Sequence, residues 1–204
     1  MMDEREIVKA GYNSIANKYL AVRTRDSADV QLIDRLLSRL PKNSLVLDAG
    51  CGAGIPITQL LSQNHRVIGI DFAFQQLILA HKLIPEASFA CQDLALLGFR
   101  EGSFDAICSY YAIIHIPRRL HSVIFSEFFN LLKPSGLILL CLGASNLPED
   151  KSENYLGAPM YWSHFDAETN IQMLRAIGFK ILNSEIVEDA SSPGSGHLFI
   201  LARK

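Results

Sequence analysis

The chain has 204 residues, of which 49% are apolar and 20% charged, a globular composition that excludes a fibrous repeat or a largely disordered chain. Lysine and arginine number 19 against 21 aspartate and glutamate residues, so the net charge is -2. The basic residues are scattered along the chain, which argues against nucleic acid as a partner or substrate.

The N-terminus and the cysteines bear on the cellular location. Residues 1–6 are charged and lack the apolar core of a signal peptide, and no apolar run reaches the ~18 residues that span a bilayer. Cys51, Cys91, Cys108 and Cys141 show neither CxxC nor zinc-like spacing. We therefore expect a soluble cytoplasmic protein without membrane association or bound metal, whose thiols are free and buried.

The first forty residues carry apolar side chains at helical spacing. The pattern covers Glu4 to about Tyr19 and again Val30 to Leu40, where Pro41 ends it. We expect two helices here that flank the rest of the domain.

From Ser44 onward, short apolar runs alternate with longer amphipathic ones. The short runs are apolar without alternation, as in a parallel sheet covered on both faces, and the repetition predicts a doubly wound α/β domain. The strands are expected at Leu45–Leu47, Arg66–Ile70, Ala87–Cys91, Phe104–Cys108 and Leu137–Leu142, and the helices at Ile55–Gln63, Phe74–Leu83 and Arg118–Leu132.

The last third of the chain changes in composition. Residues 145–159 are rich in Asn, Pro, Gly and acidic residues, which predicts a loop of a length that is usually functional or mobile. A helix (Asp166–Ala176) and two strands (Phe179–Val187 and His197–Ala202) follow, and the two strands are expected to form an antiparallel hairpin. We predict one domain over residues 1–204, with flanking helices at 1–40, a core at 44–143 and a substrate-side loop at 144–165.

A glycine-rich loop, Asp48-Ala49-Gly50-Cys51-Gly52-Ala53-Gly54, lies between a strand and a helix. Glycines allow positive φ and a close approach of a ligand to the main chain, and the following helix N-terminus offers free N–H groups. The spacing differs from the Gly-x-Gly-x-x-Gly of dinucleotide binding, and no Lys-Ser/Thr follows, as a phosphate loop would need. Asp71 ends the next strand, where it accepts ribose hydroxyls or caps the next helix. Asp93 follows the third strand and is an adenine ligand or a cap.

This set of motifs resembles the class I S-adenosylmethionine-dependent methyltransferases. The resemblance covers roughly residues 5–204 and rests on residues 46–54, Val67–Asp71, Gln92–Leu94, Phe104–Ile107 and Leu131–Leu137. It implies a Rossmann-like, mostly parallel seven-stranded sheet of order 3-2-1-4-5-7-6 with an antiparallel last strand and helices on both faces. It also implies S-adenosyl-L-methionine as methyl donor and S-adenosyl-L-homocysteine as product. Ala73 departs from the pattern, because many relatives have Ser there.

The same resemblance implies roles for single residues in cofactor binding. Gly50 and Gly52 would line the methionine part, Asp48 would reach its ammonium group, Asp71 the ribose, and Asp93 with Leu94 the adenine. Phe72 and Gln76 would flank the adenine and ribose, and Ser109 at the end of the fourth strand joins this set. The segment Tyr12–Tyr19 resembles the family's lid helix, so that Tyr19 either closes over the cofactor or packs in the core.

The methyl acceptor is expected at the end of the fourth strand. Residues 109–117 lack the Asn/Asp-Pro-Pro-Tyr/Phe signature with which members of this superfamily methylate planar amino groups. His115 is a candidate base or a structural residue before Pro117, and the cluster Met160–Phe165 walls an acceptor pocket or staples the sheet. The predicted acceptor-binding residues are Tyr111, His115, Met160, Tyr161, Trp162, His164 and His197, and the predicted catalytic residues are His115 and His164.

The predicted function is therefore methyl transfer to a small-molecule acceptor, mainly by in-line alignment and desolvation with assistance from histidine, in a monomer or homodimer. O-, N-, S- and C-methylation all stay open. A nicotinamide-dependent oxidoreductase and a catalytically silent cofactor-binding scaffold are the alternatives.

Overall fold

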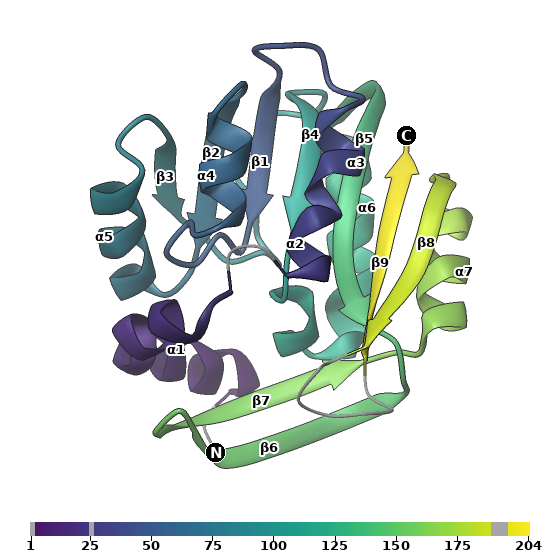
Figure 1. Cartoon of the computed structure of the whole chain (residues 1–204). Coiled ribbons are helices and arrows are strands. Elements are labelled where there is room, and N and C mark those ends of the chain that lie inside the picture. Colours follow the sequence, from purple (N-terminus) through teal and green to yellow (C-terminus); the bar gives the residue numbers. More distant parts are fainter. Residues whose placement is uncertain (1–2, 25–26, 189–195) are drawn as a thin grey trace.

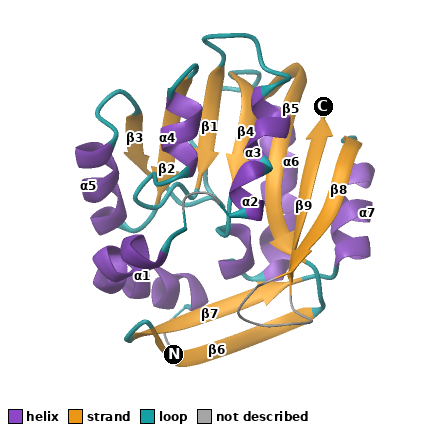
Figure 2. Ribbon diagram, viewed as in Figure 1, coloured by secondary structure: helices purple, strands orange, loops and turns teal. Residues whose placement is uncertain are grey.

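The computed structural model describes residues 3–24, 27–188 and 196–204. Its centre is a seven-stranded sheet in which β9 runs opposite to the other six strands (Figure 2). The strands are, in spatial order, β3 (Ser88–Cys91), β2 (Arg66–Asp71), β1 (Leu45–Ala49), β4 (Phe104–Ser109), β5 (Leu132–Gly143), β9 (Gly196–Arg203) and β8 (Lys180–Glu188).

The central strands are buried on both faces, which is why their sequences are apolar without alternation. The predicted doubly wound sheet is confirmed. Two further strands form a separate hairpin, so β8 and β9 are the sixth and seventh strands of the large sheet in chain order. With that numbering, the observed strand order is the predicted order, 3-2-1-4-5-7-6. The predicted antiparallel pairing of the last two strands is also confirmed.

Helices cover both faces of the sheet (Figure 1). On one face, Leu36 and Leu61 bring α3 and α4 into the core, and on the other Phe125 and Leu174 do the same for α6 and α7. The predicted helix over Val30–Leu40 is split into two short helices. The helices are α1 (Glu4–Val22), α2 (Ala28–Gln31), α3 (Ile33–Leu37), α4 (Ile57–Ser62), α5 (Phe74–Leu83), α6 (His121–Leu131) and α7 (Ala167–Ile177), with 3₁₀ turns η1 (Ile113–His115) and η2 (Arg118–Leu120).

The segment predicted to be a loop, residues 145–159, is instead largely β6 (Leu147–Tyr155), which pairs antiparallel with β7 (Ala158–His164). The charged residues of β6 are typical of a loop sequence. They also suit an exposed edge strand, because charges on an edge prevent it from pairing with a further strand. Leu156 and Gly157 both have positive φ, as a two-residue hairpin turn requires. The hairpin lies across the carboxyl ends of the central strands, beside α1 (Figure 1).

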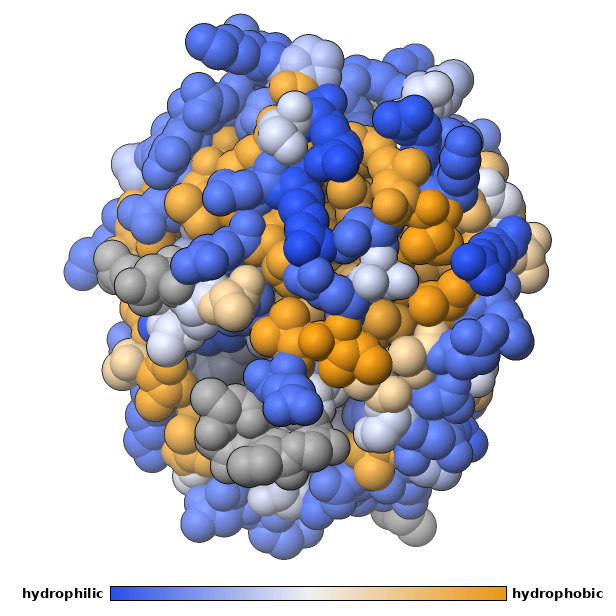
Figure 3. Space-filling model, turned by 45° about the vertical axis from the view of Figure 1, so that its right-hand side comes forward, coloured by the Kyte–Doolittle hydropathy of each residue, from blue (hydrophilic) through white to orange (hydrophobic). Residues whose placement is uncertain are grey.

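The surface and the cysteines complete the description. Figure 3 shows apolar side chains gathered among hydrophilic ones on the side of β8. Among the residues described here, no helix is long and apolar enough to cross a membrane. The thiols are free, and those of Cys108 and Cys141 are buried as predicted, but Cys91 is exposed because it ends β3 at the edge of the sheet.

Candidate active site

A cleft of about 640 Å³, including the part open to solvent, lies at the carboxyl ends of β1, β2 and β4. It has two walls. The loop side comes from the glycine loop and the ends of β2 and β3: Gly50, Gly52, Asp71, Phe72, Gln76, Gln92, Asp93 and Leu94. The lid side comes from α1 and the segment after β4: Arg5, Val8, Tyr12, Tyr19, Tyr110, Tyr111, Ala112, His115 and Ile116.

A second cavity of about 420 Å³ shares Tyr19, Gly50, Gly52 and Tyr110 with the cleft. It extends beneath the glycine loop to Asp48 and Arg23. Because the two cavities share these lining residues, a ligand that filled both would cross the glycine loop.

The glycine loop turns sharply at the end of β1. Gly50 has φ 82°, and its N–H donates to the Ile70 carbonyl of β2 at 2.8 Å. A Cβ atom at this position would overlap with the Cβ atom of Ala112 on the lid side. Both the backbone conformation and the close approach therefore require glycine here.

Asp71 connects the glycine loop to the end of β2. Its Oδ2 accepts the Gly52 N–H at 2.9 Å, and its Oδ1 accepts the Ala73 N–H at 2.8 Å. Asp71 thus caps the turn into α5, as one interpretation held, and it also lines the cleft. Desolvation raises its pKa to about 6, against the lowering effect of these hydrogen bonds. An ionised carboxylate has lone pairs left for a ligand.

Gln76 is the clearest sign of a missing partner on the loop side. Its side chain is buried and lines the cleft, yet neither its amide oxygen nor its amide nitrogen has a hydrogen-bond partner among the described residues. An unsatisfied buried polar group costs about 1 to 3 kcal/mol. A ligand with hydroxyl or amine groups beside Asp71 would supply the partners.

Asp48 lies under the loop and is buried. It accepts one hydrogen bond from the Thr58 hydroxyl at 2.5 Å, and burial raises its pKa to about 7. Arg23 lines the same cavity with its guanidinium 4.9 Å above the Tyr111 ring, and it forms no ion pair within the described ranges. Sequence reasoning missed Arg23, because a single arginine after a helix carries no motif.

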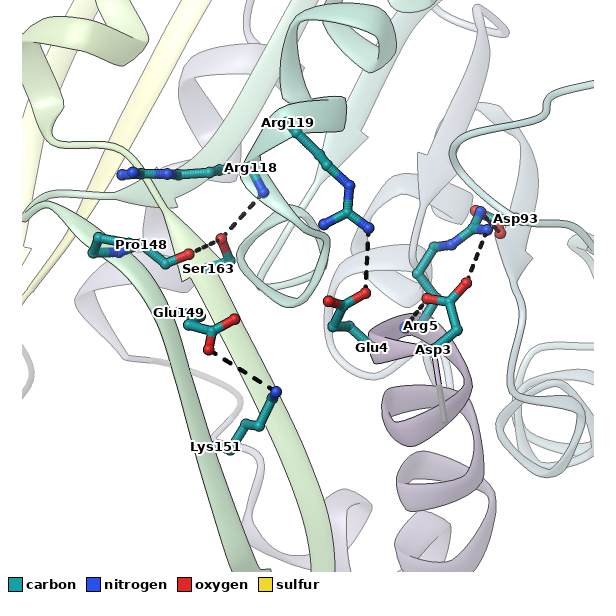
Figure 4. Close-up of polar contacts among 10 residues, drawn as sticks. All are labelled: Asp3, Glu4, Arg5, Asp93, Arg118, Arg119, Pro148, Glu149, Lys151 and Ser163. Atoms are coloured by element: carbon teal, nitrogen blue, oxygen red, sulfur yellow. Dashed lines mark hydrogen bonds and ion pairs between the residues drawn. The ribbon is translucent and has the colours of Figure 1, made fainter. Parts of the chain in front are cut away.

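Asp93 lines the cleft but already has two partners. Its Oδ1 accepts the Ala95 N–H at 2.9 Å, and its Oδ2 pairs with Arg5 at 2.8 Å. A second ion pair joins Glu4 to Arg119 at 3.2 Å. Figure 4 shows how these two pairs tie the N-terminal end of α1 to Asp93, after β3, and to Arg119 in η2. Sequence reasoning missed Arg5, because no motif includes it.

His115 is fixed on the lid side by both ring nitrogens. Its Nδ1 lies 2.8 Å from the Tyr161 carbonyl, which only accepts, so Nδ1 carries the proton. Its Nε2 therefore accepts the hydrogen bond of the Tyr12 hydroxyl, at 2.8 Å. Burial lowers the pKa of His115 to about 4, which keeps the ring neutral at pH 7. Tyr12 was noted in the lid-helix motif but not selected as a site residue.

The structure separates the remaining predicted site residues into those at the cleft and those behind it. Tyr19 and Tyr111 line it, and the His197 ring lies 4.9 Å from that of Tyr111. Ser109 does not reach the cleft: it is fully buried, and its hydroxyl donates to the Ala49 carbonyl at 2.7 Å. It joins β4 to β1 instead.

The predicted wall of residues 160–165 needs correction. Met160 and Tyr161 are buried against α1. His164 lies near the base of the hairpin, where its Nδ1 is 2.7 Å from the Ser145 carbonyl. None of these three residues lines the cleft. The prediction placed them on a loop, whereas β7 packs as the second layer of the lid side. Trp162 packs against His115 with the two rings tilted by 42° and their centroids 5.5 Å apart. Ser163 accepts the Arg118 N–H and donates to the Pro148 carbonyl.

The chain resembles known proteins in this core. A family profile described as a methyltransferase domain matches residues 46–136. The 2-methyl-6-phytyl-1,4-hydroquinone methyltransferase of Synechocystis sp. is 35% identical over 109 residues, which cover 51% of this chain and 33% of that protein. The sterol 24-C-methyltransferase of Pneumocystis carinii is 30% identical over 164 residues, covering 72% and 43%. The chain thus spans less than half the length of these two relatives.

Among solved structures, the 1,6-didemethyltoxoflavin-N1-methyltransferase of Burkholderia thailandensis, with bound 1,6-didemethyltoxoflavin and S-adenosylhomocysteine, has the same fold. The TM-score is 0.76 at 22% identity, with 100% of this chain and 91% of that chain covered. The strand order, the glycine loop with its strand-end acids and these matches lead to one conclusion: residues 46–136 form a methyltransferase domain, in a chain with the fold of the class I S-adenosylmethionine-dependent methyltransferases.

Proposed function

We propose that this chain transfers the methyl group of S-adenosylmethionine to a small-molecule acceptor bound in the cleft. The observation that carries the proposal is the amide of Gln76, which lies beside Asp71 and has no hydrogen-bond partner among the described residues. A ribose offers hydroxyl groups that can form hydrogen bonds with both side chains. The match of residues 46–136 to a methyltransferase-domain profile, and the fold shared with a methyltransferase that holds S-adenosylhomocysteine, support the identity of the cofactor.

The residues present fit this cofactor over both cavities. Asp71 and Gln76 would hold the ribose, and the backbone of Gly50 and Gly52 would face the methionine part. Leu94, Phe72 and Asp93 would surround the adenine. When bound, the cofactor supplies an electrophilic methyl group on a sulfonium, and the protein aligns it and excludes water.

The second cavity would hold the charged end of the methionine. Asp48 carries no cationic partner among its described contacts, and a ligand ammonium would favour its ionised form. Arg23, which has no ion pair with any described residue, offers its guanidinium for the carboxylate. The two opposite charges in one cavity match a zwitterionic amino acid.

A small molecule is the acceptor class that suits the cleft. The printed names of the sequence relatives refer to a hydroquinone and a sterol, and the remaining lid side is lined mainly by apolar and aromatic residues. Tyr12, which His115 holds in place, contributes a polar group there and would orient the acceptor for in-line transfer.

Titration calorimetry with S-adenosylhomocysteine tests cofactor binding. We expect Asp71→Ala to lower the affinity at least about tenfold, equal to ~1.4 kcal/mol, because the ribose loses its acceptor. Asp34→Ala is the matched control, since Asp34 is exposed on α3 away from the cleft. Equal affinities of the two variants would contradict the ribose assignment.

Two further arms separate the alternatives. Titration with NAD(H) should give no binding, whereas a nicotinamide-dependent oxidoreductase would bind it. Incubation of the protein with methyl-labelled cofactor and pooled small metabolites should transfer label into the organic fraction. Normal cofactor binding without any transfer would indicate a silent scaffold.

A further inference from the structure

The lid side presents a hydrogen-bonded chain that the proposed cofactor does not use. It runs from the Tyr161 carbonyl through His115 to the Tyr12 hydroxyl, with 2.8 Å at each step. The three residues come from β7, η1 and α1, so the chain joins every element of the lid side. Tyr12 and His115 line the cleft, and Tyr161 lies behind it.

The direction of this chain is fixed by its buried end. A carbonyl cannot donate a hydrogen bond, so His115 donates one from Nδ1 to the Tyr161 carbonyl. Its Nε2 then accepts the hydrogen bond that the Tyr12 hydroxyl donates. The Tyr12 oxygen keeps its two lone pairs; the Tyr19 hydroxyl interacts with it, which leaves one lone pair for a ligand in the cleft that both tyrosines line. This oxygen is thus suited to accept a hydrogen bond from a bound O–H group.

The charges on the lid side limit what else the acceptor carries. Arg5 is paired with Asp93, and the Asp29 carboxylate is engaged by the Tyr111 hydroxyl at 2.9 Å. Within the described part of the cleft, no further charged side chain belongs to the lid side. An anionic or cationic acceptor would therefore lose its hydration without a counter-charge.

We propose that the acceptor is an uncharged, ring-bearing compound with a phenolic or enolic hydroxyl, which donates its hydrogen bond to Tyr12. This inference rests on the proposed function. The aromatic rings of Tyr12 and Tyr19, packed edge to face with centroids 5.1 Å apart, supply the surface for such a ring. Tyr12 is then the residue that positions the acceptor hydroxyl, and His115 orients Tyr12.

The same chain provides a path for the proton that methylation of a hydroxyl releases. The bond between sulfur and methyl breaks as the bond between methyl and acceptor oxygen forms. The acceptor proton passes to the Tyr12 oxygen while the proton of Tyr12 passes to Nε2 of His115. The imidazolium keeps its Nδ1–H bond to Tyr161. Its positive charge replaces the one that the sulfonium loses, so the net charge of the buried site does not change.

A matched set of fluorescent probes tests the acceptor class: 2-naphthol, its methyl ether and 2-naphthoate, each titrated into protein saturated with S-adenosylhomocysteine. We expect 2-naphthol to bind at least about fivefold more tightly than the other two, or ~1 kcal/mol. Tyr12→Phe should remove this preference while the affinity for S-adenosylhomocysteine stays within about twofold. Tyr155→Phe, which removes another tyrosine hydroxyl of the lid side behind the cleft, should keep the preference.

Nitrogen-15 NMR of labelled histidine tests the chain itself. We expect His115 to carry its proton on Nδ1, and Tyr12→Phe to shift the Nε2 resonance. A proton on Nε2, tighter binding of 2-naphthoate, or an unchanged naphthol preference in Tyr12→Phe would each overturn the proposal. If S-adenosylhomocysteine itself fails to bind, the proposed function fails first; if it binds and the probes do not discriminate, only the acceptor assignment fails.

Discussion

The two walls of the cleft are built in different ways. The loop side is made from consecutive strand ends and the turns that follow them, between residues 48 and 94, and its contacts are largely backbone N–H groups and strand-end acids. The lid side is assembled from side chains of α1, η1 and, behind them, β7, which lie far apart in the sequence. A ligand common to a whole family can be bound by the first kind of wall, whereas the second kind can change with the acceptor.

Gly50→Ala should disturb both walls at once and gives the largest expected effect. The new Cβ atom would overlap with Ala112, and φ 82° is a strained conformation for alanine. Strain and overpacking together should lower the free energy of unfolding by about 2 to 5 kcal/mol. Urea denaturation measures this loss, and calorimetry should show that S-adenosylhomocysteine binding is abolished.

Gly98→Ala is the control for this substitution. Nothing lies within 4 Å of an added Cβ atom at Gly98, which is outside the cleft. We expect a change of less than about 0.5 kcal/mol. If Gly50→Ala resembled this control, the close contact between the two walls would not be what requires glycine.

Asp48→Asn probes the loop side alone. The pKa of Asp48 in the folded protein, about 7, lies above the ~4 of an exposed aspartate, so folding favours the protonated form. Its contribution to stability is present at acidic pH and is lost as the pH rises through 7. Asparagine does not ionise, so the variant should be more stable than the parent at about pH 8. The difference in the free energy of unfolding between variant and parent should be about 2 to 3 kcal/mol larger at about pH 8 than at about pH 5.

Denaturation of both proteins at the two pH values isolates this effect. His115 and His121 also titrate with shifted pKa values, but they are present in both proteins and cancel in the difference. Asp71 is coupled to Asp48, because its negative charge helps to raise the pKa of Asp48. The same substitution should weaken S-adenosylhomocysteine binding, because the ligand ammonium loses its carboxylate. A pH-independent difference in stability would contradict a buried ionisable Asp48.

The two walls also differ in how far the sequence predicts them. Asp71 and the glycine loop could be placed beforehand, because strand ends in a parallel sheet meet at one edge and their spacing along the chain is short. Tyr12 and His115 are 103 residues apart, and their contact depends on how α1 packs on β7. The hairpin was missed for a related reason: the polar sequence of β6 is typical of loops, and only its pairing with β7 makes it a strand.

Ser163→Ala tests the support behind the lid side. The buried Ser163 hydroxyl donates to the Pro148 carbonyl at 2.6 Å and accepts the Arg118 N–H at 3.1 Å, so it ties β7 to β6 and η2 (Figure 4). Its loss leaves these groups without a partner and should lower the free energy of unfolding by about 1 to 3 kcal/mol. Ser126→Ala, on the exposed surface of α6, should change it by less than about 0.5 kcal/mol. Equal losses would show that the hairpin is not anchored through Ser163.

Arg5→Gln gives the smallest expected effect, because the ion pair with Asp93 is partly exposed and worth less than about 1 kcal/mol. If Arg5 holds the lid closed over the ligand, its loss should weaken S-adenosylhomocysteine binding about twofold at low salt and less at high salt. Lys9→Gln is the control, since Lys9 pairs with Glu6 within the same helix. Tighter binding after Arg5→Gln would mean that Arg5 competes with the adenine for Asp93. The sign of this small change therefore decides whether Asp93 serves the loop side or the lid side when the ligand is bound.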